Sequence, residues 1–189
     1  KKFSKTANDS FEKVSTGFSK IGNIAVIAAV GVAFGKMISA AEESEKAIIA
    51  LNNSLRLTGD FTEETSQGFQ DYATALERVT GVSDEAILQQ ISYVKSLGAT
   101  NDQATKVTKT ALDMAAALGV SLDTAVAQLT GTFAGNVGLL GKQIPELKKF
   151  TKEQLAAGDA VEFLSKKFSG SAANSIQGFT GQFTQFKIA

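Results

Sequence analysis

The residues that offer chemistry in this sequence are few, and the first of them are acidic. Glu63 and Glu64 form an adjacent pair directly after Thr62, at the expected start of a helix. Acidic side chains in a first helical turn stabilise the helix dipole. Because no other catalytic pattern accompanies the pair, we favour this structural role.

A glycine-rich stretch is the second candidate. Residues 135–142 (GNVGLLGK) resemble a phosphate-binding loop, in which backbone N–H groups and a lysine hold phosphate. The register GxxxxGK[ST] is not met, because Gln143 follows the lysine and Gly135 stands one residue too early. No strand is expected before the stretch, so we do not expect it to bind phosphate.

Two basic pairs are the remaining candidates. Lys148-Lys149 and Lys166-Lys167 stand in predicted helical regions. Short charge runs of this kind are typical of solvated helix faces, and we favour that interpretation over a track for DNA.

Composition narrows the function further. The chain has no Cys and no His, so it cannot build thiolate or His-ligated metal sites, disulfides or a Ser-His-Asp triad. Nineteen basic residues balance 19 acidic ones, which argues against a surface that grips nucleic-acid phosphates. We expect no catalytic, metal-binding or cofactor-binding residues, and therefore a protein that is not an enzyme and has no cofactor.

The elements that would hold such residues are predicted to be helices throughout. Residues 1–58 are predicted to form a helical arm, because apolar and small side chains recur every three or four positions. This spacing is typical of a helix that pairs with another helix. The expected oligomer seam comprises Phe3, Phe11, Val14, Phe18 and Ile21.

An uncharged run, residues 24–35 (IAVIAAVGVAFG), lies within this arm. A membrane-spanning helix needs about 20 apolar residues, and the run has roughly half of that. Its GxxxG step permits close helix packing in water or in lipid. We favour burial in an oligomer or bundle over membrane contact at some stage of function. The expected contact residues are Ile24, Val26, Ile27, Val30, Gly31, Val32, Phe34 and Gly35.

Residues 59–170 are predicted to form a compact helical array. Gly59, Gly81, Gly98 and Gly119 each follow a helical run, and glycine adopts the left-handed conformation that ends a helix. Ser83, Thr100 and Ser121 follow three of these glycines and are expected to cap the next helix. After Gly59, either Asp60 or Thr62 must cap. Connections this short predict antiparallel neighbours.

Each helix has an apolar face. The faces are expected at Ala47, Ile48, Leu51 and Leu55; at Phe69, Tyr72, Ala73, Leu76 and Val79; at Ile87, Leu88, Ile91, Val94 and Leu97; at Val107, Ala111, Met114 and Leu118; and at Leu122, Ala125, Val126, Leu129 and Phe133. The predicted fold is therefore all-α, with a long apolar or amphipathic N-terminal helix or helices followed by a compact antiparallel multi-helix domain.

The later elements are predicted from local signals. Four glycines in residues 131–141 predict a loop or a frayed helix, and Pro145 suits the first turn of a short helix. Thr151 is expected to form a capping box with Gln154, and Asp159 to cap a helix that ends near Phe168. Residues 171–189 are expected to begin a further helix, with an apolar stripe at Ile176, Phe179, Phe183 and Phe186.

One stretch resembles a known family. Residues 111–172 contain AAALG followed by SLD, a glycine-rich turn, LLGKQIPEL, T-x-E-Q and G-x-A, and they are similar to the tail tape measure proteins of bacteriophages and prophages. The upstream sequence EESEKAIIALNNSLRLTGD also resembles this family. The resemblance covers roughly residues 36–189. The chain lacks an initiator Met and stops inside a helical pattern, so we interpret it as an internal piece of a longer protein.

The resemblance implies a structural role in the virion. Such a chain lies in the lumen of the phage tail, where its length sets the length of the tube, and it is made in the host cytoplasm. The implied partners are tail tube and tail tip proteins, tail assembly chaperones and further copies of the chain. Release ahead of the DNA implies contact with the host membrane, and no sequence-specific binding of nucleic acid is implied.

Two other functions remain open from the residues alone. The first is a pore-forming, membrane-active protein built around residues 24–34. The second is a helical binding module of the cytoplasm.

Overall fold

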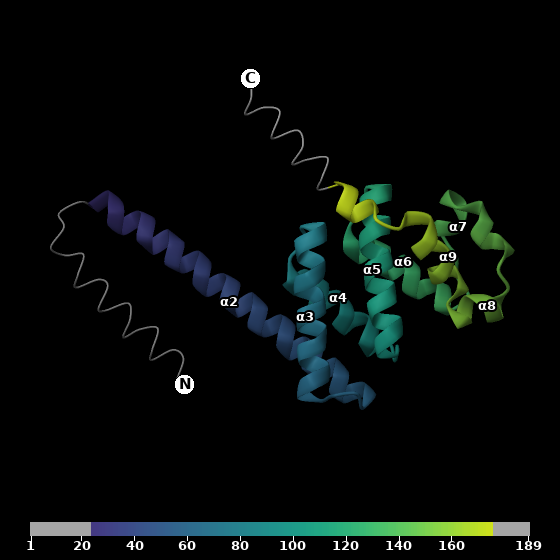
Figure 1. The fold of residues 1–189 in the computed structure, drawn as a ribbon, viewed down its shortest axis with the longest axis horizontal. Helices are drawn as coiled ribbons and strands as arrows, with labels where there is room; N and C mark the ends of the chain where they lie inside the picture. Colours follow the sequence, from purple (N-terminus) through teal and green to yellow (C-terminus); the bar gives the residue numbers. More distant parts are fainter. Residues whose placement is uncertain (1–23, 176–189) are drawn as a thin grey trace, which may run out of the picture. The chain divides into compact units, whose positions relative to one another are not determined.

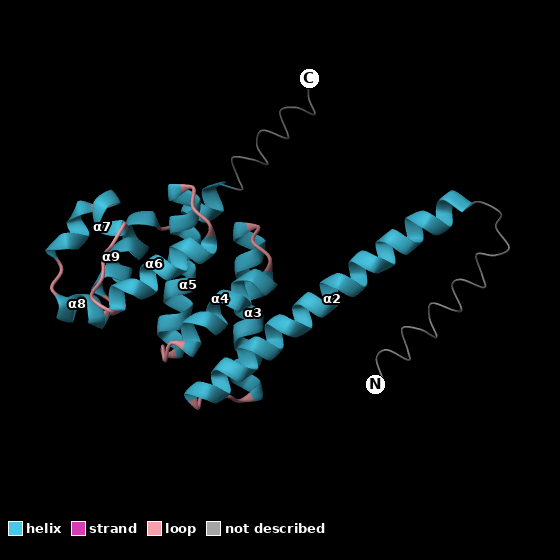
Figure 2. Ribbon diagram, turned by 180° about the vertical axis from the view of Figure 1, so that it is seen from behind, coloured by secondary structure: helices cyan, strands magenta, loops and turns pink. Residues whose placement is uncertain are grey.

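The computed structural model describes the backbone of residues 24–175 and the side chains of residues 41–175. Every regular element in this part of the chain is a helix (Figure 2). The elements are α2 (Ile24–Thr58), α3 (Glu63–Thr80), α4 (Asp84–Ser96), α5 (Asn101–Leu118), α6 (Leu122–Phe133), α7 (Leu140–Gln143), the 3₁₀-helix η1 (Pro145–Lys149), α8 (Lys152–Ala157) and α9 (Asp159–Phe168). The predicted all-α class is confirmed, whereas the antiparallel order of the helices stays a prediction.

The compact part of the molecule begins inside the long helix α2. The chain divides into two units, Lys1–Ser44 and Glu45–Ala189. Of the four apolar residues predicted on this part of α2, Ala47, Leu51 and Leu55 are buried and Ile48 is half-buried. The last turns of α2 therefore contribute to the core of the second unit.

Caps define the helix ends as the glycine and hydroxyl pattern predicts. Gly81 and Gly119 adopt left-handed φ values of 68° and 67°, where a side chain would be strained. Ser83, Thr100 and Ser121 accept hydrogen bonds from the third residue of their helices. Thr62 caps α3, which decides between the two residues proposed after Gly59.

The predicted capping box of Thr151 with Gln154 is present, and Thr100 forms a second one with Gln103. Pro145 occupies the first turn of η1. The predicted cap at Asp159 is wrong. Gly158, with φ of 93°, ends α8 and is also the N-cap of α9, so Asp159 is already the first helical residue.

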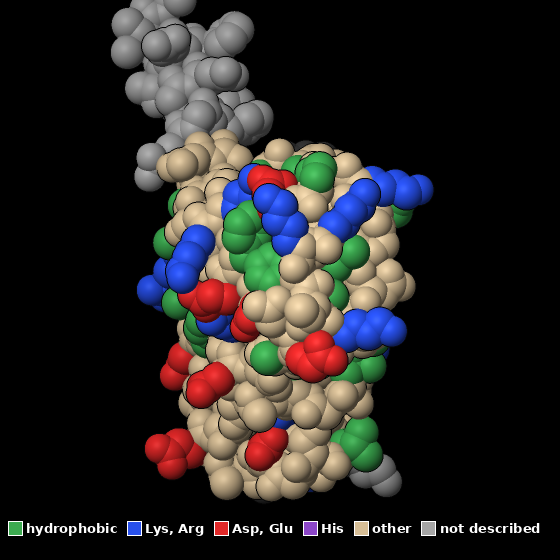
Figure 3. Space-filling view, turned by 90° about the vertical axis from the view of Figure 1, so that its right-hand side faces the viewer, with side chains coloured by type: hydrophobic (Ala, Val, Ile, Leu, Met, Phe, Trp, Pro, Cys, Tyr) green, Lys and Arg blue, Asp and Glu red, His purple; other side chains and the backbone are tan. Residues whose placement is uncertain are grey.

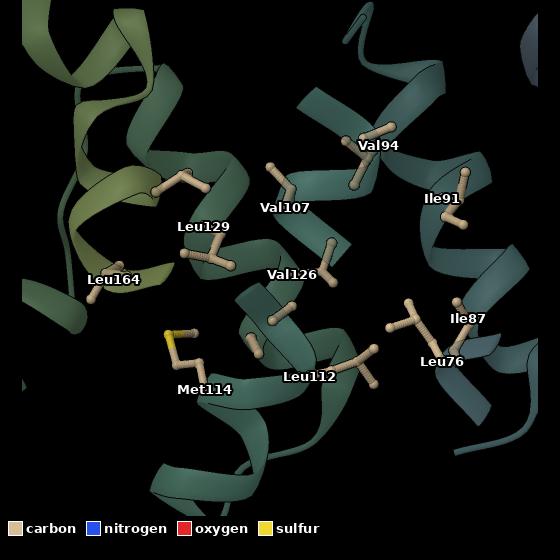
Figure 4. Close-up of a cluster of buried hydrophobic side chains, with 14 of the residues drawn as sticks. Leu76, Ile87, Ile91, Val94, Val107, Leu112, Met114, Val126, Leu129 and Leu164 are labelled. Carbon is tan, nitrogen blue, oxygen red and sulfur yellow. The ribbon is translucent and has the colours of Figure 1, made fainter. Parts of the chain in front are cut away.

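The core is centred on α5, which packs against α4, α6 and α9. Figure 4 shows buried hydrophobic side chains that α3, α4, α5, α6 and α9 contribute to the core. Of the predicted apolar faces, most residues are buried or half-buried. Val79 and Leu97 are exceptions, because each stands at a helix end where the chain turns away, and they are 51% and 58% exposed.

The two ends of the glycine-rich stretch are helical rather than looped. Gly131 lies within α6, and Gly141 within α7. Gly135 and Gly138 take positive φ values in the turn between these helices. The stretch is therefore a short turn flanked by helix, which the prediction of a loop or frayed helix covers in part.

Residues 171–175 are helical, and Ala172 is buried. The Ala172 N–H donates to Oδ1 of the buried Asp113 at 3.1 Å, so a side chain of α5 bonds the first turn of this segment. The predicted stripe at Ile176, Phe179, Phe183 and Phe186 lies outside the described residues.

A matched pair of variants tests whether the end of α2 belongs to the core. Leu51 is fully buried, whereas Leu57 on the same helix is 74% exposed. We expect Leu51→Ala to lower the free energy of unfolding by about 2–5 kcal/mol, because it leaves a cavity. Leu57→Ala should change it by no more than about 0.5 kcal/mol. Urea unfolding measures both, and equal effects would contradict the assignment.

Candidate functional site

The acidic pair lies where a structural role requires it. Glu63 and Glu64 are exposed in the first turn of α3, directly after the N-cap Thr62. Among residues 41–175, no cluster of three or more acidic side chains is arranged to hold a metal ion. The pair therefore stabilises the positive end of the helix dipole.

In the turn at residues 135–142, several backbone N–H groups donate hydrogen bonds to acceptors within the same turn. The Asn136 side chain accepts a hydrogen bond from the Gly138 N–H at 2.9 Å, and Gly141 N–H donates to the Val137 carbonyl at 2.8 Å. Lys142 N–H donates to the Leu139 carbonyl at 3.0 Å. A phosphate cradle needs free, convergent N–H groups, and in this turn these three are already bonded.

The basic pairs are solvated, as predicted. Lys166 binds Glu162 of the same helix at 3.0 Å, and Lys167 binds Glu146 of η1 at 3.2 Å. Lys148 and Lys149 are exposed on η1. Both pairs are therefore exposed on helix surfaces.

The sequence patterns did not predict an ion pair between a buried lysine and a partly exposed aspartate. Lys95 on α4 has no exposed surface, and its Nζ lies 2.5 Å from Oδ2 of Asp60 and 2.7 Å from the Ala99 carbonyl. The hydrogen bond from Lys95, then that from Thr58, holds the pKa of Asp60 below its usual value. The spacing places Lys95 on the buried face, four residues after Ile91, but it does not indicate the partner.

A second polar contact joins α3 to α5. The Tyr72 hydroxyl donates to the Thr105 carbonyl at 3.0 Å. Burial raises the pKa of Tyr72 to about 12, and the negative charge of Asp113 adds to the rise. Tyr72 therefore remains a neutral hydrogen-bond donor at physiological pH and acts as a structural group.

The predicted contact residues of the arm are not brought together by the described structure. The structure gives only the backbone of α2 at the residues predicted for the uncharged run, which are Ile24, Val26, Ile27, Val30, Gly31, Val32, Phe34 and Gly35. Phe3, Phe11, Val14, Phe18 and Ile21 lie outside the described residues. No helix in the described part of the chain combines the length and apolarity needed to cross a membrane. Both sets of contact residues stay predictions.

The comparisons with known proteins decide the assignment. The family model described as "Prophage tail length tape measure protein" matches residues 8–157. The chain belongs to the tape measure protein family. No curated protein and no solved structure matches it.

The residues that the family model matches differ from those over which the sequence resemblance was found. It begins at residue 8, so it includes the uncharged run and most of the predicted seam, and it ends at residue 157, the last residue of α8. The G-x-A element at residues 158–160 lies beyond it. The features shared with tape measure proteins thus extend from the arm to α8.

Membership fixes the class of function. Tape measure proteins are structural, non-enzymatic components of the phage tail that take part in determining its length.

The Lys95–Asp60 pair predicts a pH-dependent stability. Because the folded protein lowers the pKa of Asp60, this stabilisation is present above the ordinary value of about 3.9 and is lost as the pH falls through the lowered value. Asp60→Asn should therefore destabilise the chain at neutral pH, where it leaves Lys95 buried without a counter-ion. The difference from the native chain should shrink at acidic pH.

Urea unfolding at about pH 7 and about pH 3 measures this difference. Asp71→Asn is the control, because Asp71 is exposed and forms no ion pair among the described residues. An Asp60→Asn effect that is equal at both pH values would show that the pair does not stabilise the fold.

Proposed function

We propose that this chain is a segment of the ruler that lies in the lumen of a phage tail and fixes the length of the tube. The observation that carries the proposal is the family match over residues 8–157. The helical arm supplies a physical basis for it. A helix rises about 1.5 Å per residue, so a helical chain converts residue number directly into length.

The helix α2 is the part of the chain that suits this role. Its 35 residues correspond to about 52 Å of helix. The compact unit beginning at Glu45 is folded back on itself by short turns, so its residues add much less length each. Under this proposal, the number of residues in the arm determines the length of the tail.

The partners of the chain follow from the same role. During assembly in the host cytoplasm, tail assembly chaperones cover the chain before tail tube subunits polymerise around it, starting at the tail tip. Several copies lie together in the tube and pack along the predicted seam and the apolar run at residues 24–35. During infection the chain leaves the tube ahead of the DNA, where the same run is available to meet the host membrane.

Insertions at two places test the ruler. Inserting about 36 helix-forming residues between Ser44 and Glu45, roughly ten turns, preserves the face of α2 that enters the core and should lengthen tails by about 54 Å. Electron microscopy of many tails gives the mean length.

The matched control inserts a flexible segment of the same length into the exposed turn between Asn136 and Val137. It adds the same number of residues outside the arm and should leave the tail length unchanged. A mean tail length that does not change after the first insertion would contradict the proposed ruler mechanism. Equal lengthening by both would show that total residue number, rather than arm length, is measured.

A further inference from the structure

The end of the compact unit formed by α7, η1 and α8 carries unpaired basic side chains. Four lysines of this end are exposed and form no ion pair among the described residues: Lys142, Lys148, Lys149 and Lys152. We call them the basic patch. Glu146 in the same stretch is bound by Lys167. Glu153 is exposed in the same stretch and forms no ion pair among the described residues, so it reduces the net positive charge there. Figure 3 faces this end and shows basic side chains mostly over its upper half, with acidic side chains beside them and below them.

The helices α3 and α4 carry the opposite charge. Six acidic residues, here called the acidic face, form no ion pair among the described residues: Glu63, Glu64, Asp71, Glu77, Asp84 and Glu85. The two basic residues of these helices are Arg78 and Lys95, and Lys95 is buried against Asp60. Arg78 is exposed, and Asp84 is half-buried and accepts a hydrogen bond from Thr74 at 3.3 Å, so the exposed charges of α3 and α4 are mainly but not wholly acidic.

The two surfaces stand at opposite sides of the compact unit. In Figures 1 and 2, α5 and α6 lie between α3 on one side and α7 and α8 on the other. A basic patch and an acidic face so far apart cannot neutralise each other within one molecule. They are placed to meet the complementary surfaces of two other molecules.

We infer that the basic patch of one copy of this chain docks on the acidic face of a second copy. Complementary charge steers such encounters and suppresses wrong partners. A nucleic acid is a poorer occupant of the basic patch, because the chain as a whole has no net positive charge and its acidic face repels phosphates. The inference rests on charge and placement alone and goes beyond the ruler role.

The contact has a definite symmetry. It joins two different surfaces, so it is heterologous, and it produces a closed ring or an open chain of copies. This distinguishes it from the apolar seam predicted for the arm, which would hold copies side by side through like surfaces. Ion pairs at an exposed contact are screened by salt, whereas an apolar seam is not.

Cross-linking tests the contact without interference from the arm. The chain has no Cys, so single cysteines can be placed at will. We expect Asp71→Cys mixed with Lys149→Cys to form a covalent dimer with a short bifunctional maleimide at low salt. Each variant alone should cross-link at least about tenfold less, and added salt should suppress the mixed product.

Charge reversal supplies the second test. Lys148→Glu with Lys149→Glu removes the basic patch, and Glu64→Lys with Asp71→Lys reverses the acidic face. We expect each double variant alone to lose the salt-sensitive part of self-association in sedimentation velocity. An equimolar mixture should regain it, because one variant keeps the acidic face and the other keeps the basic patch. Lys46→Glu, an exposed change outside both surfaces, should behave like the native chain.

Circular dichroism, which measures helix content, is used to check that each variant folds. Like-with-like cross-linking equal to the mixed product, or a mixture that fails to associate, would overturn the inference. So would loss of binding to a DNA duplex in Lys148→Glu with Lys149→Glu while self-association persists, because the patch would then serve nucleic acid. Tail length is not measured in these experiments, so a negative result would contradict the docking contact without contradicting the ruler mechanism.

Discussion

Burial of apolar surface against α5 is the interaction on which the compact unit depends. The helices around it are short, since α4, α6 and α9 have 13, 12 and 10 residues. Isolated helices of this length are marginal in water. They persist because each buries an apolar face on α5 or on a neighbour that contacts it. The end of α2 takes part through Leu51 and Leu55, so the arm and the compact unit share a helix.

The sequence was sufficient to predict what depends on local chemistry. Gly81 with Ser83 and Gly119 with Ser121 specify a helix end and the next helix start through backbone conformation and one hydrogen bond each. The predicted buried faces were correct in the middle of each helix. They failed at Val79 and Leu97, because periodicity continues to the last residue whereas burial stops where the chain turns.

What the sequence could not give depends on contacts between distant residues. Lys95 is buried because Asp60, 35 residues earlier, supplies a counter-charge. Asp113 binds the backbone of Ala172, 59 residues later. Neither pairing follows from spacing. The charged surfaces also needed the structure, because Lys142 and Lys152 look like ordinary exposed lysines until α7, η1 and α8 are seen to lie away from α3 (Figure 1). The acidic pair, by contrast, was correctly assigned to a helix start.

These features fit a scaffold built from two kinds of helical structure. The arm offers length, since it is helical along α2, and the compact unit offers a stable folded body with charged surfaces. The family assignment gives that combination a place in the phage tail. The ruler role requires that α2 remains helical when the chain lies in the assembled tail.

A distance measured inside tails tests this claim most directly. Because the chain has no Cys, spin labels can be attached uniquely at Lys36→Cys and Leu57→Cys, and the labelled chain can be diluted with unlabelled copies. A helical α2 predicts a distance of about 32 Å by pulsed electron paramagnetic resonance. An extended chain would give about 70 Å, and a distance that long, or a broad distribution without a peak near the helical value, would contradict the account.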